Sequence, residues 1–261
     1  MDNTLSKEWK NIEWVLTDVD DTLTWQGQLP PETLVALQSL QQRGIKVVAV
    51  TGACAGWCDH IAQLWPVNAV LGENGAFVLE KGAKGVSLSS SVPLREMRAR
   101  QAELKTQIEQ ILLNYSDINL TLDQAYRLCE VAIDIGQNRE PLDSALVEEI
   151  LTKIHQLDAH ATASSIHINA WYGEHSKRNS SFAFLQSKGL TEKDILERCC
   201  YVGDSLNDQQ MFETLPLTVG VKNIEHYWDK LTHKPSKVMS QPGGFGFAEF
   251  THQLLEITDK E

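Results

Sequence analysis

Three short apolar runs of this 261-residue chain each lead into a cluster of small polar or acidic residues. The runs cover residues 14–17, 45–50 and 199–202, and the clusters that follow them begin at Asp18, Thr51 and Gly203. In a parallel sheet the carboxyl ends of the strands lie on one edge, and ligands bind at that edge. The sequence therefore predicts an α/β fold in which three clusters that are distant in sequence meet in space.

The segments between these runs have the spacing of amphipathic helices. Leu34, Leu37 and Leu40 recur at helical spacing over residues 33–43, and Gly44 follows them. Further helices are expected over residues 93–115, 142–157, 177–188 and 206–212 and from 247 onward, and further strands over residues 69–71, 76–79, 129–135, 165–171 and 217–219. This alternation is typical of a Rossmann-like doubly wound parallel sheet.

The middle of the chain has a different pattern. Residues 81–85 are rich in Gly and Lys, as a hinge would be, and residues 129–135 alternate between apolar and polar side chains, which predicts a half-exposed strand. Helices and strands with one polar face favour a small α+β domain inserted into the first domain. We therefore expect a core domain from residues 1–82 and 171–261 and an inserted α+β cap domain from residues 83–170.

The charge balance excludes several classes of partner. With 23 Lys and Arg against 35 Asp and Glu, the net charge is −12. Because no Lys/Arg tract is present, neither nucleic acid nor an anionic membrane surface is an expected partner. No run approaches the roughly 18 apolar residues of a membrane span, and the first residues are charged where a signal peptide is apolar. We expect a cytoplasmic protein.

Acidic side chains dominate two of the clusters. Asp18 and Asp20 follow the first run, and Asp204 and Asp208 follow the third. Four carboxylates in one crevice repel one another, and a hard divalent cation with oxygen ligands offsets that repulsion. We expect Mg²⁺, which binds one or two carboxylates and shares its other positions with water and substrate phosphate.

Two further groups fit a phosphate ligand. Lys177 stands at the start of a predicted helix and supplies a positive point charge. Thr51, followed by Gly52, offers a hydroxyl and nearby backbone N–H groups without side-chain bulk. Each feature alone is common in turns and helix caps, so the prediction rests on the order of all of them along the chain.

Other motifs predict packing or turns instead of chemistry. Cys54 and Cys58 lie four residues apart, but no further Cys or His has ligand spacing, so we expect them in the core. The five cysteines form no disulfide pattern and indicate reduced thiols. Residues 243–246, Gly-Gly-Phe-Gly, lack the ending of a phosphate loop and predict a turn. His167 and its neighbouring histidines are expected as strand or surface residues.

The ordered motifs resemble those of the haloacid dehalogenase superfamily. Its first motif is similar to Asp18-x-Asp20-x-Thr22-Leu23, its second to Thr51, its third to Lys177 and its fourth to residues 203–208. The insertion between the second and third motifs is similar to the cap of the Cof-like, type IIB members, which include sugar phosphatases and phosphomannomutases. One departure is Ala53, where these relatives often carry Arg.

The resemblance implies a role for each acidic residue. Asp18 would be the nucleophile that attacks phosphorus, and Asp20 would act as general acid and then as general base. Asp18 and Asp204, with the backbone carbonyl of Asp20, would hold Mg²⁺. Asn207 and Asp208 would lie behind these ligands and orient both Lys177 and the ligands.

The resemblance also implies groups that bind the substrate. Thr51 and Lys177 would contact the phosphoryl oxygens. For the rest of the substrate we expect contributions from the cap near residues 167–171 and from core loops near residues 57–60 and 73–74. The individual candidates are Gly52, Asn74, Asn169 and Trp171.

The function that follows is a Mg²⁺-dependent phosphatase acting on a small phosphorylated metabolite, with a sugar phosphate as the expected substrate. A phosphotransferase or phosphomutase would use the same residues and pass the phosphate to a second hydroxyl. A receiver-like signalling protein also combines Asp, Thr and Lys around Mg²⁺, although the inserted cap and the Asp-x-Asp pair argue against it. Both a monomer and a homodimer are compatible with the sequence.

Overall fold

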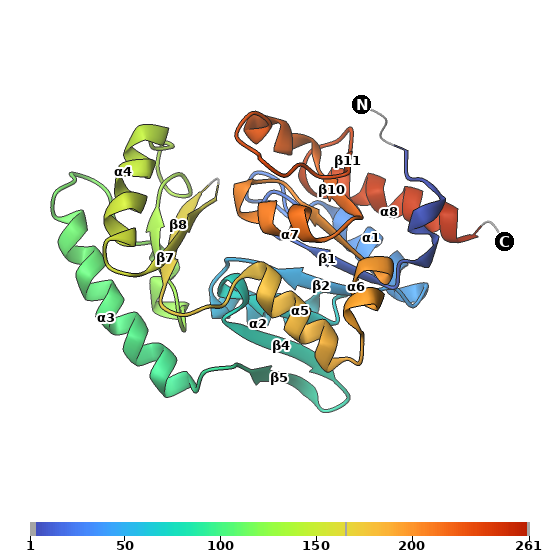
Figure 1. Cartoon of the computed structure of the whole chain (residues 1–261), viewed down its shortest axis with the longest axis horizontal. Helices are drawn as coiled ribbons and strands as arrows, with labels where there is room; N and C mark the ends of the chain where they lie inside the picture. Colours follow the sequence, from blue (N-terminus) through green and yellow to red (C-terminus); the bar gives the residue numbers. More distant parts are fainter. Residues whose placement is uncertain (1–3, 165, 260–261) are drawn as a thin grey trace.

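The computed structural model describes residues 4–164 and 166–259 and contains two α/β bodies (Figure 1). The larger is built on an eight-stranded sheet and the smaller on a three-stranded sheet. Both chain termini lie on the larger body, and the middle of the sequence, green and yellow in Figure 1, forms the smaller one. An inserted domain is therefore confirmed, as is the α/β class.

The large sheet has the strand order β11-β10-β9-β1-β2-β3-β4-β5. Its strands are β1 (Trp14–Thr17), β2 (Lys46–Val50), β3 (Ala69–Gly72), β4 (Phe77–Gly82), β5 (Gly85–Ser89), β9 (Cys199–Gly203), β10 (Thr218–Gly220) and β11 (Lys237–Val238). The pairings from β11 to β3 are parallel, and β4 and β5 add an antiparallel edge. The predicted doubly wound sheet is thus confirmed, with β1 in its interior.

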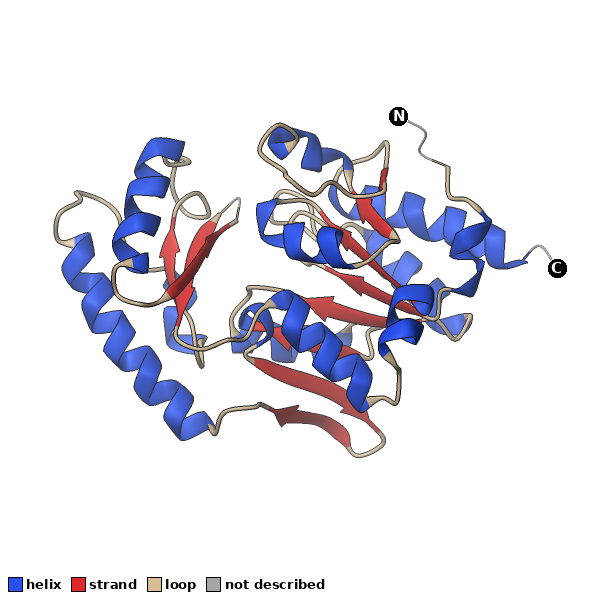
Figure 2. Cartoon of the chain, in the orientation of Figure 1, coloured by secondary structure: helices blue, strands red, loops and turns tan. Residues whose placement is uncertain are grey.

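Helices cover both faces of this sheet (Figure 2). They are α1 (Pro31–Gln42), α2 (Ala55–Leu64) and α8 (Gly243–Asp259) on one face and α5 (Lys177–Ser187), α6 (Glu192–Arg198) and α7 (Gln209–Thr214) on the other. Since successive side chains of a strand point to opposite faces, Val15 packs in the first layer and Leu16 in the second. This double burial explains why the central strands are continuous apolar runs.

The smaller body, the cap, has the strand order β6-β8-β7 with two helices on one face. Its elements are α3 (Leu94–Leu112), β6 (Val131–Asp134), α4 (Ser144–His155), β7 (His160–Ala163) and β8 (His167–Trp171). Residue 165, which begins the strand expected over 165–171, lies outside the described residues. The opposite face of this sheet is turned toward the core (Figure 1).

Three expectations differ from the structure. Strand β5 pairs with β4 in the large sheet, so residues 85–89 lie with the core, whereas Trp171 ends a cap strand. All of residues 129–135 are buried, because the polar face of β6 packs toward the core instead of facing water. Residues 243–246 form the first turn of α8, not a separate turn. A Cβ on Gly244 would lie 2.0 Å from Thr33 Oγ1, so the glycines allow α8 to approach α1 closely.

Within the described part of the chain, no helix is both long enough and apolar enough to cross a membrane.

Candidate active site

The three predicted clusters lie side by side at one edge of the large sheet. Thr17 of β1 is paired with Ala49 of β2 and with Val202 of β9, so the residues that follow these strands are neighbours. Asp18 continues the β1 pairing by donating its N–H to the carbonyl of Val202 at 2.9 Å. The parallel register therefore brings Asp18, Thr51 and Asp204 together, as the strand-edge argument predicts.

Three carboxylates form a compact buried group at this edge. Oxygen atoms of Asp18, Asp204 and Asp208 all lie within 4.8 Å of one another, and none of these residues is more than 4% exposed. Burial raises the pKa of Asp18 to about 7, with Asp208 and Asp20 adding to the effect and Lys177 opposing it. Burial also raises the pKa of Asp204 well above its usual value, and Asp18 and Asp208 reinforce that shift.

Lys177 lies inside this acidic group. It is the first residue of α5, which begins after Ser176, whose hydroxyl accepts the N–H of Asn179. The Lys177 ammonium lies 2.9 Å from Asp18 Oδ1 and 2.8 Å from Asp208 Oδ1. Those two carboxylates raise the pKa of Lys177 despite its burial, so it carries its charge at neutral pH.

The carboxylate of Asp208 is occupied by donors from the protein. Besides Lys177, the Tyr201 hydroxyl donates to Oδ1, and the backbone N–H groups of Asp204 and Ser205 donate to Oδ2 at 2.9 and 3.2 Å. Asp208 therefore fixes the loop after β9 and the ammonium of Lys177. The side-chain oxygen of Asn207 accepts from the Ser205 hydroxyl at 2.8 Å and lies 3.4 Å from Lys177 Nζ.

Asp18 and Asp204 are the carboxylates that suit a cation. The two oxygens of Asp204 are oriented by the Thr22 hydroxyl at 3.0 Å and by the Asn223 amide at 2.9 Å, which leaves lone pairs on both. Only Lys177 compensates the buried charge of the three-carboxylate group within the contacts that the structure describes. A hard divalent cation with oxygen ligands fits this donor set, since it would supply the missing positive charge.

A small cavity lies directly over these groups. Its volume is about 20 Å³, and it is lined by Asp18, Asp20, Gly52, Ser164, His167, Asn169, Asp204, Ser205 and Asn207. Ser164, His167 and Asn169 come from the cap, so the cap lies closed over this edge of the sheet. A space of this size holds about one or two water molecules. The cap must therefore move before a larger molecule can enter.

Asp20 lines this cavity without being fully buried. Desolvation, reinforced by Asp21, raises the pKa of Asp20 to about 6, against the opposing effects of Lys177 and Arg127. A carboxyl with this pKa exchanges its proton readily near neutral pH.

Three predicted site residues have other environments. The hydroxyl oxygen of Thr51 accepts the N–H of Ala53 at 3.0 Å, and Thr51 does not line the small cavity. The Asn74 amide donates to Glu130 of the cap at 2.8 Å, so it joins the two domains. Trp171 lines a separate cavity and packs between the rings of His160 and His175.

Two acidic residues that join the cap to the core were not assigned such a role from the sequence. Glu73 accepts three backbone N–H groups of the cap loop, those of Leu128, Cys129 and Glu130, at 2.7 to 2.8 Å. Glu130 lies in the segment that was expected to be half exposed. Its place on the polar side of the alternating segment 129–135 was the available signal, because a polar side chain of a cap strand has to face something polar.

Arg127 is the other residue that sequence reasoning missed. Its guanidinium donates to the Gly52 carbonyl at 2.9 Å and pairs with Asp123 and Glu130. An arginine from the cap thus lies beside the turn that contains Ala53. Members of the haloacid dehalogenase superfamily often carry an Arg of their own at the position of Ala53. A Cβ on Gly52 would lie 2.5 Å from the Asn169 amide nitrogen, so a side chain here would displace Asn169.

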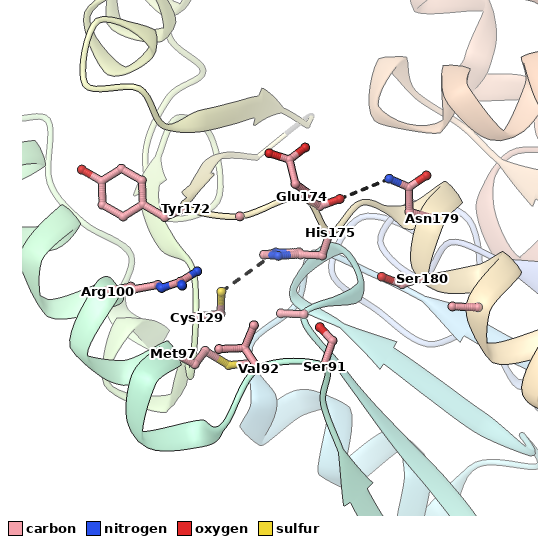
Figure 3. Close-up of a pocket in the computed structure, with 13 residues that line it drawn as sticks. Ser91, Val92, Met97, Arg100, Cys129, Tyr172, Glu174, His175, Asn179 and Ser180 are labelled. Carbon is pink, nitrogen blue, oxygen red and sulfur yellow. Dashed lines mark hydrogen bonds between the residues drawn. The ribbon is translucent and has the colours of Figure 1, made fainter.

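The two connections between core and cap meet at a third cavity (Figure 3). It has a volume of about 440 Å³ and includes Ser91 and Val92 of the first connection and Tyr172 and His175 of the second. The sulfur of Cys129 faces His175 Nε2 across it at 3.9 Å. Empty space at a hinge allows the connections to bend without steric clash, which fits a cap that opens and closes.

Known proteins are similar to this chain in sequence and in fold. The profile of the haloacid dehalogenase-like hydrolases matches residues 15–126. Over 219 residues the chain is 25% identical to a phosphoglycolate phosphatase of Methanoculleus marisnigri. The alignment covers 81% of this chain and 85% of that protein.

Solved structures extend the similarity to both domains. A Thermoplasma acidophilum protein superposes with a TM-score of 0.73 at 16% identity, over 94% of this chain and 99% of that one. The sucrose-phosphatase of Synechocystis sp., solved with sucrose and phosphate, superposes with a TM-score of 0.66 at 12% identity, over 94% and 98%. Residues 15–126 thus match the haloacid dehalogenase-like hydrolases, and the solved structures share the fold of both domains.

Proposed function

We propose that this protein is a Mg²⁺-dependent phosphatase that hydrolyses a small phosphorylated metabolite, a sugar phosphate, through an aspartyl-phosphate on Asp18. One observation carries the proposal. Asp18 pairs with Lys177 and lies beside Asp204 in a closed cavity that also contains Asp20. A nucleophile, a cation, a metal-binding carboxylate and a proton donor are the groups that phosphoryl transfer needs, and they are within reach of one substrate phosphate.

Asp18 has the surroundings of a nucleophile. Lys177 at 2.9 Å holds its carboxylate in place and favours the charged form. In the first step an oxygen of Asp18 forms a bond to phosphorus while the ester P–O bond breaks. Lys177 also attracts the phosphoryl oxygens, whose charge must be stabilised in the transition state.

Asp20 would move the proton that both steps require. With a pKa of about 6 it is protonated in a useful fraction of molecules and donates its proton to the leaving oxygen. In the second step Asp20 takes a proton from water, the water oxygen bonds to phosphorus, and the bond from phosphorus to Asp18 breaks. Inorganic phosphate is released and the Asp18 carboxylate is restored.

The metal would be held by the carboxylates of Asp18 and Asp204 and by the backbone carbonyl of Asp20. When bound, Mg²⁺ supplies positive charge that offsets both the carboxylates and the phosphoryl oxygens. Asp208 and Asn207 orient Lys177 and the loop that carries Asp204. Gly52 and Asn169 line the same cavity, and we propose that they contact the substrate.

The test is phosphate release by the purified full chain. We expect inorganic phosphate from sugar phosphates in the presence of Mg²⁺ and none after chelation with EDTA. A phosphotransferase or mutase would instead leave the phosphate on an organic product, which ³¹P NMR distinguishes from inorganic phosphate. Absence of phosphate release from a panel of sugar phosphates and from p-nitrophenyl phosphate, with Mg²⁺ present, would overturn the proposal.

A further inference from the structure

A second cavity adjoins the small one over Asp18. It has a volume of about 140 Å³, and both cavities include Asp20 and His167 among their lining residues. The larger cavity extends between the core helix α2 and the cap, and Trp57, Trp65 and Asp123 line its walls. Space for roughly ten water-sized groups is available there, whereas the cavity over Asp18 holds one or two.

The position of Asp20 assigns the two cavities to two parts of a substrate. The phosphoryl group must lie against Asp18, and the proposed acid must reach the oxygen that leaves. Asp20 lies on the boundary between the two cavities. A substrate whose phosphorus is at Asp18 and whose leaving oxygen is at Asp20 therefore extends into the larger cavity.

The larger cavity contains no cation to bind an acidic leaving group. None of the described residues that line it is Lys or Arg, and its two acidic side chains are Asp20 and Asp123. His167 is uncharged near neutral pH, because burial lowers its pKa to about 4. Its Nε2 lies 2.7 Å from the Gln137 side-chain oxygen, so this pair offers neutral hydrogen-bonding groups.

Arg127 is close to this cavity, but its charge is already compensated. The guanidinium donates to both oxygens of Asp123, at 3.3 and 3.1 Å, and lies 3.4 Å from Glu130 Oε2. It also donates to the Gly52 carbonyl, and its side chain is fully buried. A carboxylate on the leaving group would thus meet Asp123 before it met an available cation.

The remaining lining suits an uncharged, hydroxylated group. Trp57 and Trp65 present aromatic surface, against which the C–H face of a sugar or polyol can pack. Asn169, only 6% exposed, has a side-chain oxygen without a hydrogen-bond partner in the adjoining small cavity. An unpartnered buried acceptor is costly unless a ligand donates to it, and a leaving-group hydroxyl at the boundary between the two cavities would be such a donor.

We propose that the cavity bounded by Asp20, Trp57, Trp65, Asp123 and His167 receives the leaving group and selects an uncharged, hydroxylated one over one that carries a carboxylate. This inference rests on the proposed phosphatase function and adds the charge class of the substrate. It separates this chain from its relative in Methanoculleus marisnigri, a phosphoglycolate phosphatase, since phosphoglycolate carries a carboxylate on its leaving group.

A matched pair of phosphate esters tests the selectivity. Glycerol 3-phosphate and 3-phosphoglycerate differ in having a hydroxymethyl group or a carboxylate at the far end of the leaving group. We expect kcat/KM for glycerol 3-phosphate to exceed that for 3-phosphoglycerate at least tenfold. As competitive inhibitors of p-nitrophenyl phosphate hydrolysis, the two esters should show inhibition constants in the same order, which gives a measurement even where turnover is slow.

Asp123→Asn tests the physical cause. This change removes the negative charge that compensates Arg127, so the preference for glycerol 3-phosphate should shrink by about tenfold. Glu148→Gln makes the same change in charge on an exposed residue of α4 and should leave the preference at its wild-type value. A melting temperature for each variant shows that the ratio is measured on folded protein.

The outcomes separate this inference from the function on which it rests. Absence of activity toward p-nitrophenyl phosphate and every other ester overturns the proposed function itself. An active phosphatase that hydrolyses or binds 3-phosphoglycerate as well as glycerol 3-phosphate overturns only the charge selectivity. A ratio that Asp123→Asn and Glu148→Gln leave equally unchanged overturns the assignment of that selectivity to the balance between Asp123 and Arg127.

Discussion

Lys177 joins two carboxylates that would otherwise repel each other. Its ammonium contacts Asp18 at 2.9 Å and Asp208 at 2.8 Å, and all three side chains are almost fully buried. Asp208 is held by three further donors, so Lys177 has a rigid partner on one side and Asp18 on the other. Under the proposed function, Lys177 would thereby position Asp18 as the nucleophile.

Asp18→Asn should abolish turnover while the protein stays folded. The amide is a poor nucleophile, so we expect kcat to fall at least about a thousandfold, as losses of a catalytic nucleophile do. The fold should persist, because Asn removes one of the mutually repelling carboxylates and Asp208 still pairs with Lys177. Phosphate release and a thermal melt check the two statements, and retention of a tenth of the wild-type rate would contradict the role of Asp18.

Asp204→Asn should remove the stabilisation that Mg²⁺ provides. A ligand at one hundred times its dissociation constant stabilises the folded state by about 2.7 kcal/mol, which raises the melting temperature by about 5–10 °C in a chain of this size. Thermal melts with MgCl₂ and with EDTA measure this difference in the wild type and the variant.

The matched control for this metal experiment is Glu225→Gln, which changes an exposed residue of the core domain. It should retain the full difference between MgCl₂ and EDTA. A wild-type protein whose melting temperature is the same under both conditions would argue against a metal in the acidic group. An undiminished difference in Asp204→Asn would remove that residue from the ligands.

At the scale of elements, the cap is attached to the core by a small set of polar contacts. The Glu73 carboxylate accepts the N–H groups of residues 128–130, while Asn74 and Arg127 add one cross-domain contact each, to Glu130 and to the Gly52 carbonyl. These bonds can break and reform as a unit because they converge on one short loop. Cys129 of the same loop also lines the hinge cavity at the two connections, so the loop adjoins the hinge.

Glu73→Gln should loosen the cap. The amide nitrogen of Gln is a donor, so at least one of the three cap N–H groups loses its acceptor, which costs about 1–3 kcal/mol. We expect hydrogen exchange at residues 128–130 to become about 10- to 100-fold faster and KM to rise, with exchange in β1 unchanged.

A matched variant on the core separates cap loosening from general destabilisation. Glu80→Gln alters a surface carboxylate of the core domain that pairs with Lys188. Hydrogen exchange at residues 128–130 should then stay as in the wild type. If Glu73→Gln also left exchange in this loop unchanged, the contact would not limit cap opening.

At the scale of the whole molecule, the order of elements and the catalytic edge could be predicted from the sequence because both depend on local patterns. Asp18 and Asp204 end apolar runs, and the parallel register then requires them to meet. The cap contacts could not be predicted in this way. Arg127 and Glu130 meet Gly52 and Asn74 only through the placement of one domain on the other, and no periodicity along the chain encodes that placement.

Two other predictions, the turn at residues 243–246 and the exposure of residues 129–135, were wrong for related reasons. Gly243 and Gly244 resemble a turn, yet they begin α8, and a Cβ on Gly244 would lie 2.0 Å from Thr33 Oγ1 of α1. The strand at residues 129–135 alternates like a half-exposed strand, yet it is buried on both faces because the core supplies a polar surface opposite Glu130. In both places a tertiary contact overrides the local pattern.

The buried carboxyls of the whole molecule determine how its stability depends on pH. Burial raises the pKa of Asp18 to about 7 and that of Glu130 to about 8. In the unfolded chain both groups lose their protons near pH 4, so each stabilises the folded protein fully at low pH and ceases to do so as pH rises through its folded pKa. His167 and His175 have lowered pKa values of about 4 and act in the opposite direction, mainly below pH 7.

Between pH 7 and pH 8 the metal-free protein should therefore lose about 1 kcal/mol of unfolding free energy. Urea unfolding in EDTA at both pH values measures this change. Glu130→Gln should remove more than half of it, whereas Glu148→Gln, with the same change of charge on an exposed helix, should keep all of it. Saturating Mg²⁺ should reduce the loss, since a cation favours the ionised form of Asp18. An unfolding free energy that rises over this interval would mean that these carboxyls are already ionised in the folded protein.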